Sequence, residues 1–347
     1  MDNILDLTLA ELEDRLTRMG EPKFRASQVW AWLWRHGCRD FSAMTNVAKS
    51  LRERLAATWV IAWPRIHTLQ ESTDTTVKLL LQYADGALVE TVLIPEKDRF
   101  TQCLSTQVGC AMGCTFCSTG KMGFLRNLTG GEIAMQVLVA RDLLGQQGKG
   151  DRLTNLVFMG MGEPLMNWPE VKRSMEILHS EHGLNFSRRK ITLSTCGIKK
   201  GLQEFAKHGL ALPAISLHAP TQELRKQIMP GAARLPLDEL MALLESYPLQ
   251  PRERVTIEYI LLGGVNDTPQ HARQLVKLLA RLKCKVNLIA FNPGPGIPYK
   301  SPTREAVLAF EQILWDKGMT CILRKSKGQD IAAACGQLRA KADRSGS

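Results

Sequence analysis

The sequence predicts an α/β protein built on a partial (β/α)6-type barrel, preceded by a small helical domain and a β-hairpin. Two observations predict the barrel. From residue 101 onward, short apolar runs alternate with longer amphipathic runs, which is typical of parallel strands that are each followed by a covering helix. The polar and cysteine-rich motifs come directly after the strand candidates, where the functional residues of a barrel lie.

The region before the barrel divides into two parts. Residues 1–57 read as helices, and "RASQVWAWLWRHG" places Val29, Trp30, Leu33 and Trp34 at helical spacing, as core residues of a helical domain would be. Residues 58–100 contain two strand-like runs separated by Asp85-Gly86, a pair typical of a hairpin turn. We therefore expect a helical domain at 1–57, a β-hairpin extension at 58–100 and the barrel at 101–347.

The barrel elements follow in chain order. The seven strand candidates are "TQCLSTQ", "NLVFMG", "KITLST", "LPAISLH", "RVTIEYILL", "KVNLIAF" and "TCILR". The helical stretches between or after them are "GEIAMQVLVARDLL", "VKRSMEILHSEHG", "KKGLQEFAKHG", "LDELMALLESY", "HARQLVKLLARL" and "REAVLAFEQILWDKG".

Composition narrows the class of protein. Hydrophobic residues make up 44% of the chain, but no apolar run approaches the roughly 20 residues of a membrane span. The acidic start "MDNILDLTLAELEDRL" does not resemble a signal peptide, so we expect a cytoplasmic protein without a membrane partner. Nine cysteines, an odd number, argue against a disulfide framework. The formal charge of +11 favours polyanionic partners, chiefly nucleic acid.

Three cysteines stand within eight positions in "GCAMGCTFCSTG", as Cys110, Cys114 and Cys117. A structural zinc site usually has four protein ligands, and Cys103 in the preceding strand is the available fourth. An iron–sulfur cluster held by three thiolates would instead leave one iron open to a chelating substrate or cofactor. The spacing alone leaves both alternatives open.

The position of this motif resembles the radical S-adenosylmethionine superfamily, in which three cysteines after the first strand of a partial barrel hold one [4Fe–4S] cluster. In that superfamily S-adenosylmethionine chelates the open iron. "MGMGEP" resembles the motif that ends the second strand, which implies that Gly162 and Glu163 contact the methionine amino group of the cofactor. The resemblance also implies cofactor contacts for residues at later strand ends, namely Ser194, Ser216, Leu217, His218 and Asn292.

Further motifs resemble one family within that superfamily, the dual-specificity rRNA/tRNA adenine C2-methyltransferases. They occur in the family's order along nearly the whole chain: "ETVLIPE", "CLSTQVGCAMGCTFCSTG", "GFLRNLT", "FMGMGEPLMN", "STCG", "ISLHAP", "FNP" and "GQDIAAACGQL". The N-terminal "KFRASQVWAWLW" resembles the family's small helical domain, which implies an RNA-binding role for residues 1–57.

This resemblance implies a mechanism that uses S-adenosylmethionine twice per turnover. One molecule methylates Cys335, and a second gives the radical that activates the S-methyl group for addition to adenine C2. Cys103 then forms a transient disulfide with Cys335 and releases the product. Glu90 matches the base that removes the C2 proton. Cys38, Cys196, Cys284 and Cys321 match no such motif and are expected in the core.

The implied partners are 23S rRNA in its peptidyl-transferase region, tRNA at the adenosine 3′ of the anticodon, and an electron donor such as flavodoxin or ferredoxin. A monomer is expected. Two alternatives remain at this point. One is the sister enzyme that methylates C8 of adenine in 23S rRNA and confers antibiotic resistance. The other is a non-catalytic RNA-binding zinc protein.

Overall fold

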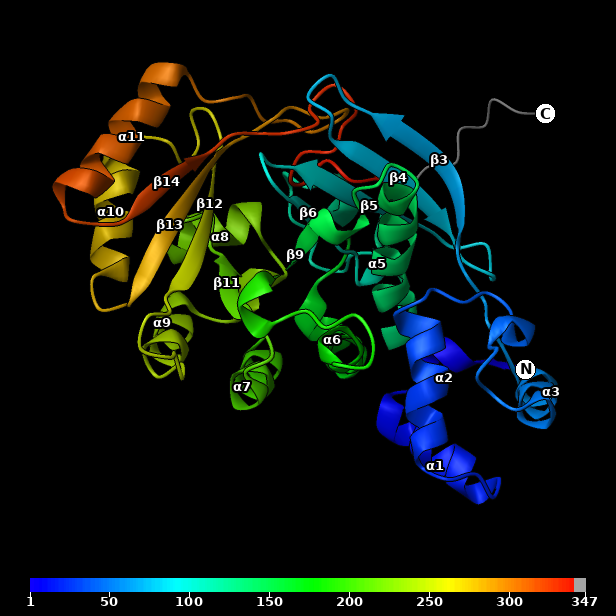
Figure 1. The fold of residues 1–347 in the computed structure, drawn as a ribbon. Helices are drawn as coiled ribbons and strands as arrows, with labels where there is room; N and C mark the ends of the chain where they lie inside the picture. The colour runs from blue at the N-terminus through cyan, green and yellow to red at the C-terminus, as the bar shows by residue number, and fades with distance from the viewer. Residues whose placement is uncertain (340–347) are drawn as a thin grey trace.

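The computed structural model describes residues 1–339; residues 340–347, which belong to the region predicted as the barrel, lie outside the described residues. Near the N-terminus the chain forms three helices (Figure 1). Thr8 begins the first of them with a capping box to Glu11. Trp30 and Trp34 are buried with ring centroids 5.8 Å apart, so the predicted helices and their core tryptophans are confirmed. The helices are α1 (Leu9–Arg18), α2 (Phe24–Trp34) and α3 (Lys49–Thr58).

One ten-stranded sheet organises the rest of the chain, in the order β14-β13-β12-β11-β10-β9-β6-β5-β4-β3. The strands from β14 to β6 run parallel, and β5, β4 and β3 add an antiparallel extension. Its strands are β3 (Arg65–Glu71), β4 (Val77–Gln82), β5 (Leu88–Pro95), β6 (Phe100–Cys103), β9 (Leu153–Phe158), β10 (Ile191–Thr195), β11 (Leu212–Ser216), β12 (Val255–Leu261), β13 (Cys284–Ala290) and β14 (Cys321–Arg324).

Helices cover the outer face of the parallel part of this sheet (Figure 1). They come from the connections between consecutive parallel strands, as right-handed βαβ units require. Within residues 1–339, no helix combines the length and apolar character needed to cross a membrane. The covering helices are α5 (Gly130–Gly145), α6 (Trp168–His179), α7 (Lys199–His208), α9 (Leu237–Glu245), α10 (Pro269–Leu279) and α11 (Arg304–Asp316). The short α8 (Gln222–Ile228) lies instead at the carboxyl ends of the strands, where Ile228 joins the apolar cluster of Met112 and Phe116.

The sheet is open, with β14 and β3 as its edges in the part of the chain that the structure describes. The partial barrel is therefore confirmed, but two details of the prediction were wrong. The extension has three strands rather than two, because the polar run at β3 also pairs with β4. The first strand ends at Cys103 rather than Gln107: residues 104–106 are in no strand, and Gln107 begins the separate short β7 (Gln107–Gly109), which pairs with β8 (Phe124–Asn127).

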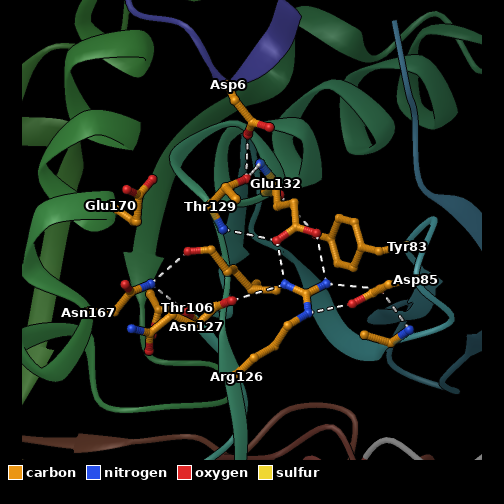
Figure 2. A network of polar contacts seen from close by, with 12 residues as sticks. Asp6, Tyr83, Asp85, Thr106, Arg126, Asn127, Thr129, Glu132, Asn167 and Glu170 are labelled. Carbon is orange, nitrogen blue, oxygen red and sulfur yellow. Dashed lines mark hydrogen bonds and ion pairs between the residues drawn. The ribbon is translucent and has the colours of Figure 1, made fainter. Parts of the chain in front are cut away.

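Arg126 on β8 fastens the β4–β5 turn to the start of α5 (Figure 2). Its guanidinium donates to both carboxylate oxygens of Asp85 at 2.6 and 3.0 Å and to both of Glu132 at 2.7 and 2.9 Å. The Tyr83 hydroxyl donates to the Glu132 carbonyl at 2.9 Å. The paired Arg126 hydrogen bond holds the pKa of the Asp85 carboxyl below its usual range.

The same network reaches the N-terminal segment (Figure 2). Thr129 and Glu132 form the capping box of α5, and the Thr129 hydroxyl donates to Asp6. Gly131 permits this close approach, because a Cβ there would lie 2.4 Å from the Leu5 carbonyl oxygen. The N-terminal helices, the extension and the barrel are thus joined at one helix terminus.

Arg126→Ala should lower the free energy of unfolding by about 2 kcal/mol, because a partly buried carboxylate, Glu132, loses its charged donor. The folded-state pKa of Asp85 is depressed, so its share of this stability is present above pH ~4 and is lost as pH falls through the folded pKa. The difference between wild type and variant in urea unfolding should therefore shrink below pH ~4. Arg18→Ala, which breaks an exposed pair with Asp14, is the control and should cost at most ~0.5 kcal/mol. Equal losses in the two variants would contradict this account.

Candidate active site

A cavity of about 150 Å³ lies at the carboxyl ends of the parallel strands. Its walls come from the loop after β7, from the ends of β9, β10 and β11, from β12 and β13, and from the C-terminal segment. This is the end of the sheet at which α/β folds bind ligands. The predicted site residues that line it are Cys110, Cys114, Cys117, Gly162, Glu163, Ser194, Ser216, His218 and Cys335.

The loop that carries the three clustered cysteines is closed at its base by β7 and β8. The Cys110 backbone N–H donates to the Gly123 carbonyl at 2.8 Å. Gly109 is in the left-handed region at φ 76°, and a Cβ there would lie 1.9 Å from the same carbonyl oxygen. Only glycine fits at this position, so the sequence folds the loop into a tight turn directly before Cys110.

The thiols of the three cysteines are enclosed together. Burial raises the pKa of Cys110 to about 12. Burial, followed by the nearby Cys117 and Cys110, raises the pKa of Cys114 well above its ordinary value. Thiolates gathered in this way need a compensating positive charge, and soft thiolate donors are the ligands of iron–sulfur clusters. The three cysteines therefore fit a [4Fe–4S] cluster and would be the residues that hold it.

Cys103 is not a fourth ligand of that set. It lies on β6, and it lines a separate small cavity with Cys335 rather than the cavity of the clustered cysteines. Among residues 1–339, no group of three or more His, Cys, Asp and Glu side chains is placed to hold a single metal ion.

Glu163 lies at the start of the loop after β9 and fixes the neighbouring backbone. Its Oε1 accepts from the Leu165 N–H at 3.0 Å and the Thr195 hydroxyl at 2.6 Å, and its Oε2 accepts from the Cys196 N–H at 2.9 Å. A carboxylate oxygen has two lone pairs, so Oε2 still has room for one donor from the cavity.

Gly162 brings that loop against the β7 strand. Its φ is 99°, and a Cβ would lie 2.6 Å from the Gln107 Cβ and 2.8 Å from the Gln107 backbone nitrogen. The glycines of the "MGMGEP" motif are therefore required by close packing, in addition to any cofactor contact.

His218 ends the β11 segment in a backbone conformation that favours glycine, with φ 56°. Its Nδ1 accepts from the Ile260 N–H at 3.1 Å, so Nε2 carries the proton. Burial, and then the Arg225 charge, lower the pKa of His218 to about 3, which keeps the ring neutral at physiological pH. A neutral imidazole donor held in a strained conformation on a cavity wall indicates a functional position.

Cys335 lies on the C-terminal segment and reaches three cavities. It lines the main cavity, the small cavity with Cys103, and a third cavity of about 200 Å³ that Arg324, Lys325 and Lys327 also line. Cys103 is buried and Cys335 is exposed, and neither forms a disulfide. Burial, followed by the charge of Cys335, raises the pKa of the Cys103 thiol to about 12.

Both ends of the Cys335 segment are fixed to other parts of the chain. Before Cys335, the β3–β4 turn holds it: Asp330 accepts from the Ser72 hydroxyl and the Thr73 N–H, and the Gly328 N–H donates to Asp74 at 3.0 Å. After Cys335, the Gly336 carbonyl accepts from the Ser118 N–H at 2.7 Å, directly next to Cys117. The Cys335 thiol is thereby placed between the extension and the cysteine loop.

Glu90 lies on β5 and does not line the main cavity. It is 5% exposed, and Lys78 pairs with its Oε1 at 3.1 Å. Its Oε2 accepts from the Arg339 N–H at 2.6 Å. The structure therefore brings Glu90 to the Cys335 segment, but as a carboxylate already engaged by two donors.

Leu217 and Asn292 are the two predicted cofactor residues that do not line the main cavity. The Leu217 side chain is fully buried, and its N–H donates to the Glu258 carbonyl at 3.1 Å. The Asn292 amide donates to the Ser326 hydroxyl at 2.8 Å. A cofactor role for either residue remains a prediction.

Three residues of this region did not stand out from the sequence. Glu258 lies within an apolar strand, and Arg225 within an ordinary amphipathic helix. Arg225 is fully buried and donates to the Cys196 carbonyl at 2.6 Å. Cys196 is buried, as expected, but it also lines the cavity. Of the three, only Cys196 could have been noticed in the sequence, because it stands in "STCG", two residues after the predicted cofactor residue Ser194.

Comparison with known families places the chain in a class. Residues 104–279 match the family model of the radical SAM superfamily, and residues 2–61 match that of the ribosomal RNA large subunit methyltransferase N-terminal domain. A crystal structure of a radical SAM methyltransferase from Sphaerobacter thermophilus superimposes with a TM-score of 0.92 at 44% identity, covering 98% of this chain and 100% of that one. The fold and the site are thus those of a radical S-adenosylmethionine enzyme, which uses a [4Fe–4S] cluster and S-adenosylmethionine.

Relatives identify the family within that class. The dual-specificity RNA methyltransferase RlmN of Nitratidesulfovibrio vulgaris (strain DSM 19637 / Miyazaki F) is 61% identical over 98% of this chain and 95% of its own length. The protein of the same name from Solidesulfovibrio magneticus is 58% identical over 100% of this chain and 99% of its own. The chain belongs to the RlmN family of dual-specificity RNA methyltransferases. It is an enzyme, and the alternative of a non-catalytic zinc protein is therefore wrong.

Proposed function

We propose that this enzyme methylates C2 of adenosine in two RNAs, 23S rRNA in the peptidyl-transferase region and tRNA at the adenosine 3′ of the anticodon. One observation carries the proposal: Cys335 lies on the walls of three adjoining cavities, which contain the three clustered cysteines, Cys103 and a group of basic side chains respectively. This arrangement suits a thiol that carries a methyl group, because such a thiol has to reach the cofactor site, its disulfide partner and the RNA.

When bound, the cluster and S-adenosylmethionine supply the electron, the radical and the methyl group. Cys110, Cys114 and Cys117 would hold the cluster, and Gly162, Glu163, Ser194, Ser216 and His218 would bind the cofactor from the other walls. Cys335 carries the methyl group to the base. The Cys103 sulfur then attacks the Cys335 sulfur, so that an S–S bond forms as the S–C bond to the product breaks; the product carbon keeps the electron pair and takes up a proton, which makes it the methyl group. An external thiol reduces the disulfide before the next turnover. Burial shields Cys103 from external disulfides and oxidants beforehand.

Glu90 is the proposed base for the C2 proton. The position of Glu90 supports this role. Its carboxylate is buried and accepts a hydrogen bond from the segment that carries Cys335, and the ammonium of Lys78 provides a counter-charge. The Arg339 N–H and Lys78 each contact one oxygen of Glu90, so each oxygen keeps a second lone pair that could accept the adenine C2 proton.

RNA would enter beside Cys335 along the cavity that Arg324, Lys325 and Lys327 line. Cationic side chains there can hold the phosphates that flank the target, and the adenosine itself must leave its stack to reach the thiol. We assign the helices of residues 1–57 to RNA binding as well. An electron donor such as flavodoxin or ferredoxin, a monomeric state and a cytoplasmic location complete the proposal, since rRNA and tRNA are cytoplasmic substrates.

The test is an anaerobic assay of the cluster-loaded enzyme with a reductant, labelled S-adenosylmethionine, and either protein-free 23S rRNA or tRNA that lacks the modification. Digestion to nucleosides should give labelled 2-methyladenosine from both RNAs. Labelled 8-methyladenosine would instead assign the chain to the C8 alternative. Label in neither RNA would contradict the proposed function.

A further inference from the structure

Glu258, in the middle of β12, has a carboxylate oxygen without a partner. Its Oε1 accepts from the Asn287 amide at 3.0 Å, whereas its Oε2 is enclosed and has no hydrogen-bond partner among residues 1–339. The residue is 3% exposed, yet it lines the main cavity. Buried carboxylate oxygens are almost always hydrogen-bonded, so this one needs an explanation.

The side chain belongs to a polar row that crosses the sheet beneath the cavity. Ser216 pairs with Glu258 in the β11–β12 register, and Glu258 pairs with Asn287 in the β12–β13 register. Ser194 on β10 begins the row, with its hydroxyl 3.2 Å from that of Ser216. The row thus crosses four neighbouring strands, and its one open acceptor is Glu258 Oε2.

Folding alone does not favour this arrangement. Burial raises the pKa of Glu258, and the Arg324 charge and the Asn287 hydrogen bond only partly offset the effect. An unpaired acceptor in the interior lowers stability, and an apolar residue would suit the surrounding strand better. Destabilising groups of this kind persist at functional positions, where a bound ligand can supply the missing hydrogen bond.

The position of Glu258 in the cavity indicates which part of a ligand it meets. The clustered cysteines, with Glu163, form one wall, where the amino-acid end of S-adenosylmethionine would bind. Ile260 and Ile289 are apolar and line the cavity on β12 and β13, where they suit a purine. Glu258 shares β12 with Ile260. In dinucleotide-binding folds a single carboxylate in a strand or turn accepts the ribose hydroxyl of the cofactor.

We propose that Glu258 is a cofactor-binding residue whose Oε2 accepts a hydroxyl hydrogen bond from the ribose of S-adenosylmethionine. The inference rests on the proposed function, because it takes this cavity to be the cofactor site. The neighbouring Ser216 hydroxyl can serve the second hydroxyl of the same ribose, since it faces the same row.

The experiment measures dissociation constants rather than turnover. Cluster-loaded wild type, Glu258→Gln and the control Glu311→Gln are titrated anaerobically with S-adenosylmethionine and with its 2′-deoxy and 3′-deoxy analogues. Glu311 is also a buried carboxyl, but it lies on α11 and does not line the cavity. A hydrogen bond to a charged acceptor corresponds to about 10- to 100-fold in affinity. Wild type and Glu311→Gln should prefer S-adenosylmethionine by that factor over one of the two analogues, the one that lacks the hydroxyl donating to Glu258.

Glu258→Gln should bind S-adenosylmethionine at least about tenfold more weakly than wild type does. It should also lose the preference for S-adenosylmethionine over the deoxy analogue. Retention of the full wild-type preference in Glu258→Gln would overturn the inference. So would a weaker affinity with the preference intact, because Glu258 would then act only through the shape of the cavity. If wild type itself fails to bind S-adenosylmethionine, the proposed cofactor site is wrong, which is a different result.

Thermal unfolding of the cofactor-free proteins separates binding from folding. Since Oε2 has no partner before the cofactor binds, Glu258→Gln should melt at the wild-type temperature or above it. Saturating S-adenosylmethionine should then raise the melting temperature of wild type more than that of the variant. A variant that melts several degrees below wild type without cofactor would give Glu258 a purely structural role and would count against the proposal.

Discussion

In a Cys103→Ala variant, RNA is expected to remain covalently attached to the protein after a single turnover. Cys103 and Cys335 line the same small cavity, and the Cys103 thiol is the proposed partner that frees Cys335 from the product. Without that thiol the bond between Cys335 and the base has no internal route to release. Multiple turnover should fall by at least about a thousandfold, because nothing else in the cavity can take over a covalent step.

A denaturing gel with labelled tRNA detects the adduct as a shifted, nuclease-sensitive band. Cys335→Ala and the double variant should give no adduct and no product, while Cys284→Ala, on β13 and outside the site cavities, should behave as wild type. Burial raises the pKa of Cys103 to about 12, so iodoacetamide at neutral pH should label the exposed Cys335 well before it labels Cys103. Normal turnover by Cys103→Ala without an adduct would refute the assignment of this thiol.

Replacing Cys114 by Ala should abolish both the cluster and methyl transfer. The anaerobic wild-type protein should contain about four irons per chain, and the variant almost none, since each of the three thiolates is needed for three-point ligation. Cys114 is chosen because burial, followed by the charges of Cys117 and Cys110, raises the pKa of its thiol, so a thiolate there needs the cluster's positive charge. Activity should fall below detection.

Cys196→Ala is the matched control for the cluster experiment. Cys196 also lines the cavity and its pKa is raised by burial, but it stands outside the motif of Cys110, Cys114 and Cys117. The iron content should stay at the wild-type level in Cys196→Ala. The ligands would be assigned wrongly if Cys114→Ala kept its iron and its iron–sulfur absorbance while Cys196→Ala lost both.

The elements of the barrel could be predicted because their signals are local. Apolar runs and the helices after them are read within a window of about 10 to 15 residues, and each of the seven parallel strands overlaps its predicted run, although the first ends four residues early. The strand β3 was missed for the same reason. It is an edge strand with mostly exposed residues, so its sequence lacks the alternation that marks a half-buried strand.

The site could be predicted only where a motif marks it. The sequence places Cys110, Cys114 and Cys117 in one loop. The partner of Glu90 depends on the β4–β5 register, which makes Lys78 its diagonal neighbour on the same face. Glu258 is hidden in "VTIEYIL", where one acidic residue in an apolar run has no meaning until the neighbouring strands are known. Charge alone is also a poor guide to the site: the basic run of Arg188, Arg189 and Lys190 precedes β10 at the end away from the cavity, and Arg188 pairs with Glu253.

The contacts between the β3–β4 turn and the segment before Cys335 join residues that are 254 to 258 positions apart in the chain. During synthesis the turn therefore emerges from the ribosome more than 250 residues before the segment does. The N-terminal helices and the strands from β3 to β6 can therefore fold before Cys335 has been added to the chain. A partial chain that stops before residue 335 would hold Cys103 without the thiol that is proposed to meet it.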